Sequence, residues 1–131
     1  MSDFVKEDNV FVNQDAESRE AVLRFIADRA AELGITDDAD AVYEAFLARE
    51  DMGETGMTDG FAVPHAKTDA IKRAAVIVVK NNRALEWPSF DDKPGDVAIS
   101  LLVPDGEAGT THSKLLSKTA VLLRREEFKN L

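Results

Sequence analysis

The stretch Ala74-Ala75-Val76-Ile77-Val78-Val79 is the longest unbroken apolar run in the chain. A continuous run of this kind, rich in β-branched residues, is typical of a strand that is buried on both faces. We therefore expect it to be a central strand. A second interior strand is predicted over Val97–Val103, where the turn residues Pro104, Asp105 and Gly106 close it. Two strands of this type need a covering layer on each side of their sheet.

Helical patterns lie on both sides of these strands in the sequence. Apolar residues recur at spacings of three and four between a cap at Asp15 or Ser18 and a stop at Gly34. A second helix is expected after the acidic pair Asp37–Asp38, whose charges suit the positive end of a helix dipole, and it should end between residues 49 and 53.

The remaining elements complete the expected architecture. A third helix is predicted from Thr110 or Thr111 to about Arg125, and short strands are predicted at 10–12, 61–63 and 85–87. Because helices and strands alternate without a repeat or a linker, we predict one α/β domain. It should be a sandwich in which helices cover both faces of a mixed β-sheet.

Composition excludes several classes of function. Sixteen Lys and Arg against twenty-five Asp and Glu give a net charge of -9, which predicts no nucleic-acid partner and no direct membrane contact. The longest apolar run has six residues, against roughly 20 for a membrane-spanning helix. No signal peptide is visible, and the absence of cysteine suits a reducing compartment, so we expect a cytoplasmic protein.

The chain has two histidines, and both fall at predicted junctions between an element and a loop. His65 follows Pro64 at the end of a short predicted strand, and His112 lies in the first turn of the third predicted helix. Ligands of open α/β sheets tend to bind where strands end. From local sequence alone, however, two inert surface histidines are the more common situation.

Other chemistries for these histidines find little support. A metal site would need Asp59 or Asp69 as further ligands, and forty-six residues separate His65 from His112, unlike the spacing of a metal-binding motif. There is no Gly-x-Ser-x-Gly elbow for a serine hydrolase, and the glycines of residues 53–60 fit neither a P-loop nor a dinucleotide fingerprint. We therefore expect no metal and no cofactor.

The residues before His65 form a longer pattern. Residues 49–65 read Arg49-Glu50-x-x-x-Glu54-Thr55-Gly56-x-x-x-Gly60-Phe61-Ala62-Val63-Pro64-His65. This pattern resembles the active-site signature of the fructose/mannitol type of enzyme IIA of the bacterial phosphoenolpyruvate:sugar phosphotransferase system. The second half agrees in order and spacing, from the stretch 87–91 through Val103-Pro104 to His112. The resemblance covers nearly the whole chain and predicts an enzyme IIA type 2 domain over residues 1–131.

The sequence departs from the family pattern at two positions. Glu54 stands where the family usually has serine, and Ser113 stands where leucine usually follows the histidine. These departures bear on substrate or partner preference more than on the core chemistry. Family members commonly run on into one more helix beyond the position of Leu131, so the resemblance allows for a missing C-terminal helix.

The resemblance implies that His65 accepts a phosphoryl group from the phosphocarrier HPr and passes it to a cysteine of a IIB component. The chain would then be a phosphotransferase that carries phosphohistidine. Arg49 and His112 would hold or align the phosphoryl group, and their structural alternatives are a surface ion pair with Glu50 or Glu54 and a helix-start histidine. Thr55, Gly56 and Gly60 would shape the loop around it, although Thr55 could simply be a turn residue.

Two other functions stay open at this point. Nitrogen-type relatives of the same fold are believed to signal their phosphorylation state to protein targets, and a free-standing domain suits that regulatory role equally well. An interaction module without chemistry would be favoured if HPr failed to phosphorylate His65. The transported sugar cannot be read from the sequence, because the family's IIA component never touches it.

Overall fold

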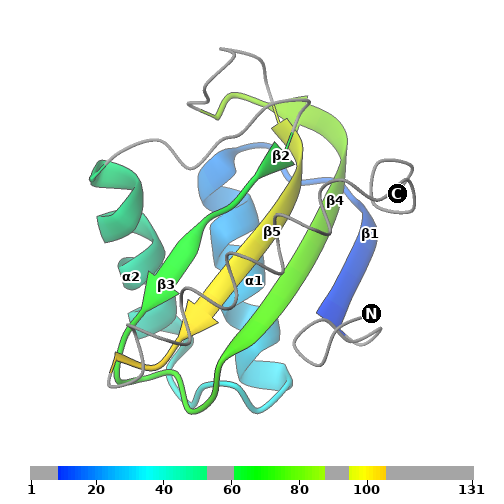
Figure 1. The fold of residues 1–131 in the computed structure, drawn as a ribbon. Helices are drawn as coiled ribbons and strands as arrows, with labels where there is room; N and C mark the ends of the chain where they lie inside the picture. The colour runs from blue at the N-terminus through cyan, green and yellow to red at the C-terminus, as the bar shows by residue number, and fades with distance from the viewer. Residues whose placement is uncertain (1–8, 53–60, 88–94, 106–131) are drawn as a thin grey trace.

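The computed structural model describes residues 9–52, 61–87 and 95–105. Two helices pack against a mixed five-stranded sheet (Figure 1). In chain order, the elements are β1 (Val10–Gln14), α1 (Arg19–Glu32), α2 (Ala39–Asp51), β2 (Phe61–Ala62), β3 (His65–Lys67), β4 (Ala75–Leu85) and β5 (Gly95–Val103). The α/β class and the mixed sheet are as predicted.

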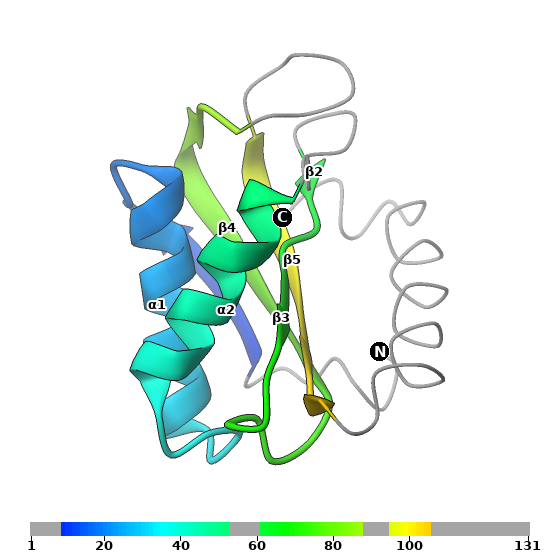
Figure 2. The same cartoon turned by 90° about the vertical axis from the view of Figure 1, so that its left-hand side faces the viewer.

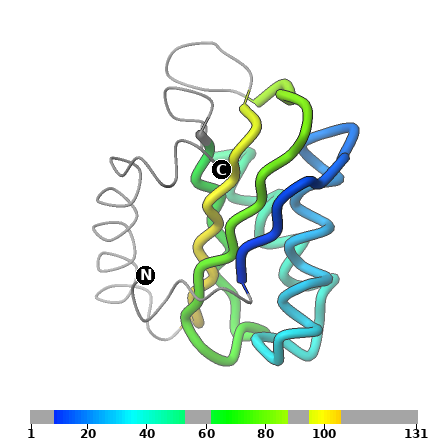
Figure 3. The backbone as a smooth tube through the Cα atoms, turned by 90° about the vertical axis from the view of Figure 1, so that its right-hand side faces the viewer, coloured from blue at the N-terminus to red at the C-terminus, as the bar shows by residue number. Residues whose placement is uncertain are grey.

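The two apolar runs form the middle of the sheet. The strand order is β1-β4-β5-β2, and β3 also pairs with β5. Strands β4 and β5 are antiparallel, from Ala75 opposite Leu102 to Leu85 opposite Gly95, whereas β1, β2 and β3 all join them in parallel. Figure 3 shows β1 alongside β4, and β4 alongside β5. The prediction of a central strand at 74–79 is therefore confirmed.

Local capping explains where the helices begin and end. The Ser18 hydroxyl accepts a hydrogen bond from the backbone N–H of Ala21, so Ser18 rather than Asp15 caps α1. Gly34 follows α1 with φ 75°, a left-handed conformation in which a side chain would be strained. The Asp38 carboxylate caps α2 in the same way, by accepting from the N–H of Ala41.

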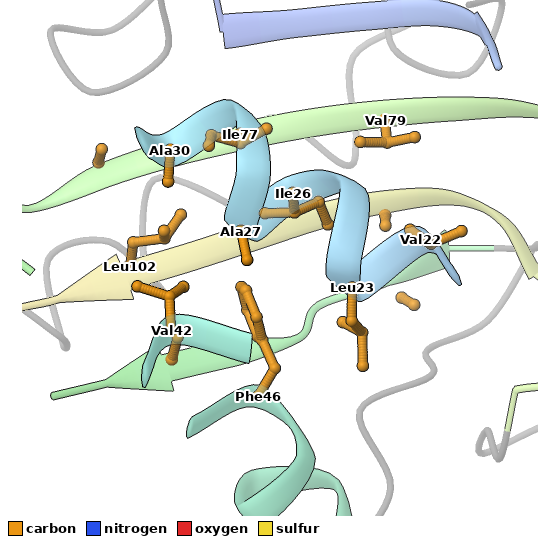
Figure 4. Packing of buried hydrophobic residues seen from close by; sticks show 14 of the residues in the cluster. Val22, Leu23, Ile26, Ala27, Ala30, Val42, Phe46, Ile77, Val79 and Leu102 are labelled. Atoms are coloured by element: carbon orange, nitrogen blue, oxygen red, sulfur yellow. The ribbon is translucent and has the colours of Figure 1, made fainter. Parts of the chain in front are cut away.

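Both described helices lie on the same side of the sheet (Figure 2). Their buried residues form one core with the sheet, and Figure 4 shows Val42 and Phe46 of α2 pointing toward α1 and the strands. The opposite face of the sheet carries a second cluster of buried residues: Val63, Val76, Val78, Val97, Ile99, Leu101 and Val103. The third predicted helix, from Thr110 or Thr111, lies outside the described residues.

Two boundaries differ from the sequence prediction. Leu85–Trp87 is not a separate strand, because β4 continues to Leu85 through an irregular register after Lys80. The polar continuation is tolerated because the buried Asn81 side chain is satisfied: it accepts from the N–H of Ala16 and donates to the Ala16 carbonyl. His65 follows the short strand β2, as expected, but it also begins a further strand, β3, that the sequence pattern does not indicate.

None of the helices in the described ranges is long and apolar enough to cross a membrane.

Candidate functional site

His65 is held by the backbone of β5. The N–H of Leu101 donates to the carbonyl of Pro64 at 2.9 Å, and His65 then stands opposite Leu101 in the parallel ladder. Pro64 has no N–H of its own, so it separates β2 from β3 without leaving an unsatisfied donor. The result is a short strand whose first residue is the histidine that the sequence pattern singled out.

Arg49 approaches the same edge of the sheet from α2. It lies in the last turn of that helix, where a positive charge is favoured by the negative end of the helix dipole. Figures 1 and 2 both show α2 running beside β3. The helix therefore presents its C-terminal half to the strand that carries His65.

A pocket of about 400 Å³ lies between α2 and the β3 edge of the sheet. Its described lining residues are Ala45, Ala48, Arg49, Met52, His65, Ala66, Lys67, Leu101 and Val103. Arg49 and Lys67 are cationic, and none of these nine residues is acidic. In a chain with net charge -9, a pocket lined in this way favours an anion, and a guanidinium can bind two oxygens of a phosphoryl group at once.

The imidazole ring of His65 has one nitrogen that solvent does not reach. The side chain as a whole is half-buried, and its Nδ1 atom is buried. A reactant arriving from solvent therefore has to approach the other nitrogen, Nε2. A neutral imidazole nitrogen is nucleophilic near neutral pH, so this arrangement suits a group transfer to Nε2.

The structure brings together two of the predicted site residues. Arg49 and His65 line one pocket, whereas His112, Thr55, Gly56 and Gly60 lie outside the described residues. Sequence reasoning missed Lys67, because the sequence pattern predicts a strand before His65 and none that begins with it. Side chains two apart on a strand share a face, so a strand that begins at His65 directs Lys67 to the same side.

Trp87 packs in the core, with only 5% of its surface exposed. It also carries a polar contact that the sequence did not indicate, because its indole Nε1–H donates to Oε1 of Glu50 at 3.1 Å. Glu50 is the neighbour of Arg49 in the chain, so this contact lies one residue along α2 from a residue that lines the pocket.

The described ranges 9–52, 61–87 and 95–105 contain no cluster of side chains suited to a metal ion. No three His, Asp or Glu side chains come together there in a way that could hold a metal ion.

Comparison with known families settles which family has this arrangement. A sequence model described as "Phosphoenolpyruvate-dependent sugar phosphotransferase system, EIIA 2" matches residues 3–131. The chain belongs to this EIIA 2 family. Its resemblance to enzyme IIA type 2 is thereby confirmed, and membership supports a phosphotransferase-type role in the phosphotransferase system.

Relatives of this EIIA 2 domain are named either as sugar-transport components or as regulatory proteins. A fructose-specific EIIA component from Haloferax volcanii is 34% identical over 84% of this chain and 71% of its own length. A nitrogen regulatory protein from Bradyrhizobium diazoefficiens is 32% identical over 97% of this chain and 82% of its own length. Transport and regulatory proteins thus share the family.

A solved structure has the same fold. The IIA mannitol enzyme from Escherichia coli, in complex with its phosphorylated IIB partner, gives a TM-score of 0.77 at 18% identity, covering 94% of this chain and 83% of that one. At this identity the likeness concerns the fold alone.

Proposed function

We propose that this EIIA 2 domain is a phosphoryl carrier that accepts a phosphoryl group on Nε2 of His65 from HPr and passes it to a IIB component during sugar uptake. The observation that carries the proposal is the shared pocket, which joins His65 to Arg49 and contains no described acidic side chain. The burial of Nδ1 supports the choice of Nε2.

The loading step needs a nucleophile and a good leaving group. The Nε2 lone pair attacks the phosphorus of phosphohistidine on HPr, and the phosphorus–nitrogen bond on the HPr side breaks. Its electron pair stays on the HPr ring nitrogen, which takes up one proton while the His65 ring gives one up. The phosphoryl group moves between two imidazoles of similar basicity, so the step is close to balanced and requires no ATP.

Arg49 supplies the electrostatic part of the reaction. During transfer, negative charge spreads over the three equatorial oxygens of the phosphoryl group, and catalysis depends on in-line positioning and on donors aimed at those oxygens. The planar guanidinium offers a fork of N–H donors of suitable geometry. We assign His112 to alignment of the phosphoryl group and Thr55, Gly56 and Gly60 to the shape of the surrounding loop, as the family pattern implies.

Unloading reverses the roles. A cysteine thiolate of IIB attacks the phosphorus, the bond to Nε2 breaks, and its electron pair returns to the His65 ring, which regains its proton. The solved complex of a related IIA with a phosphorylated IIB supports a IIB component as acceptor.

Intact-mass measurement after incubation with phosphoenolpyruvate, enzyme I and HPr tests the proposal. The wild-type chain should gain one phosphoryl group, which acid removes and base does not, because the bond is phosphorus to nitrogen. His65→Ala should abolish the gain. A wild-type chain that gains nothing, or a variant labelled to the wild-type extent, contradicts the assignment.

A regulatory role is the second candidate, and the similarity to a nitrogen regulatory protein over 97% of the chain favours it. Both roles predict that His65 is labelled, so the two differ in the fate of the bound phosphoryl group. A transport component should release its phosphoryl group rapidly to IIB proteins of its own organism. A regulator should keep it and bind a protein target with an affinity that changes on phosphorylation.

A further inference from the structure

A buried carboxylate follows Arg49 in the chain. The side chain of Glu50 is only 3% exposed, and its Oε1 atom has two partners from other elements. The indole N–H of Trp87, just beyond β4, donates to it at 3.1 Å, and Nη1 of Arg19, the first residue of α1, lies 3.5 Å away. One carboxylate therefore joins the end of α2 to the start of α1 and to the segment after β4.

This placement opposes two local preferences. Taking a carboxylate out of water is unfavourable unless it is paired and hydrogen-bonded. Glu50 also lies in the last turn of α2, the negative end of that helix dipole, where an acid is disfavoured. Charge pairing with Arg19 and the hydrogen bond from Trp87 offset this cost. A residue that breaks local rules while its contacts satisfy it marks a position with a specific task.

The task follows from helix geometry. Successive side chains on a helix point about 100° apart, so Glu50 can face Trp87 and α1 while Arg49 faces the pocket. The last turn of a helix frays readily because its carbonyls lack intrahelical partners. A carboxylate tied to two other elements holds this turn in one orientation and so fixes the direction in which Arg49 leaves the helix.

We infer that Glu50 is a positioning residue, which acts through Arg49 to preorganise the guanidinium beside His65. This inference rests on the proposed function, because positioning matters only if Arg49 stabilises a transferring phosphoryl group. Transition-state donors are effective when they are fixed before the reaction begins, and a supporting contact to a neighbouring rigid element supplies that fixation.

A double-mutant cycle tests the inference. Glu50→Gln keeps an acceptor for the Trp87 N–H but loses the charge that Arg19 meets, so loading from phospho-HPr should slow by roughly 10-fold at saturating HPr. In an Arg49→Ala background, the same change should slow loading hardly at all. A role in folding alone would instead lower the melting temperature without this dependence on Arg49. Equal slowing in both backgrounds, or none in either, would overturn the inference.

Matched variants keep the test interpretable. Glu44→Gln makes the same chemical change at an exposed position of α2 and should load at the wild-type rate. If Glu50→Gln does not fold, Trp87→Phe removes the indole donor together with part of a buried ring, and it should show a smaller slowing with the same dependence on Arg49. Wild-type labelling at His65 separates the two proposals: if it fails, the proposed function is wrong, and if it succeeds while the cycle is additive, only the role of Glu50 is wrong.

Discussion

The two ends of the α1–α2 pair are joined to the sheet by different chemistry. At the end near the pocket, the buried Glu50 carboxylate meets Trp87 and Arg19. At the opposite end, the buried contacts are neutral and mostly backbone, and the charged contacts, Lys72 with Asp37 and Arg73 with the carbonyl of Leu33, are exposed. The buried Thr36 hydroxyl donates to the carbonyl of Ala70 at 2.7 Å and accepts from the N–H of Asp38, and the N–H of Lys72 donates to the carbonyl of Ile35 at 2.8 Å.

This difference indicates that one end of the helix pair serves stability and the other serves phosphoryl transfer. Neutral hydrogen bonds between backbone groups stabilise the distant end whatever the charge nearby. The joint near the pocket depends on a charge balance, so a change at one partner alters the orientation of the others. We expect substitutions at the distant end to change stability and substitutions near the pocket to change phosphoryl transfer.

Arg49→Ala should have the largest effect on transfer. Loading from HPr and unloading to IIB should both slow by roughly 100-fold or more, because one preorganised donor is lost. The melting temperature should stay close to that of the wild type. Rapid-quench rates for each half-reaction measure this, with Arg24→Ala, which removes surface ion pairs with Asp28 and Asp40, as the control. A large fall in stability without slower transfer would remove the contrast between the two ends.

Thr36→Val should have the reverse signature at the distant end. The shape of the side chain is kept, but the carbonyl of Ala70 and the N–H of Asp38 lose their partner. Unfolding by urea should show a loss of about 1 to 3 kcal/mol, the cost of leaving buried polar groups unsatisfied. Loading of the folded protein should proceed at the wild-type rate. Slower loading at full occupancy of the folded state would show that this end communicates with the pocket.

Lys67→Met tests the second cation of the pocket. The side chain is exposed, so water screens its charge, and loading should slow only by roughly 3- to 10-fold. Added salt should reduce the difference between variant and wild type. An effect as large as that of Arg49→Ala would make Lys67 an equal partner in binding the phosphoryl group.

Glu20→Gln should have the smallest effect. The pKa of Glu20 is lowered from its ordinary value of 4.5, chiefly because its own backbone N–H donates to the carboxylate, with Arg19 adding a hydrogen bond and a charge. A lowered pKa stabilises the fold above the ordinary value, and this contribution is lost as pH falls through the native pKa. Because the group is largely exposed, the variant should lose only about 0.3 kcal/mol at neutral pH.

Urea titrations at neutral and at acidic pH check this prediction. The difference between Glu20→Gln and the wild type should disappear at acidic pH. A difference that grows as pH falls would have the wrong sign.

The centre of the sheet could be predicted from sequence because strands buried on both faces must be apolar throughout. The second half of β4 could not be predicted, since Asn81 is satisfied by the backbone of Ala16, far away in the chain. A three-residue strand such as β3 is too short to carry a periodic pattern, so Lys67 went unnoticed. The family pattern selected Arg49 and His65, but only the fold shows that they line one pocket.

Glu50 was beyond sequence reasoning for a different reason. An acid beside an arginine on a helix usually indicates a solvated ion pair. Its burial depends on Trp87 and Arg19, which come from other parts of the chain, and no local rule contains that information.

The parallel pairing of β3 also determines when the pocket can form as the chain is synthesised. His65 pairs with Leu101, and β1 pairs with β4 through Val10 and Val78. Among the strands of the described ranges, only β4 and β5 are consecutive antiparallel neighbours, so their pair is the first that a short loop closure can give. Since β5 is the partner of β3 within the part of the chain that the structure describes, the strand that carries His65 can join it only after β5 has been synthesised.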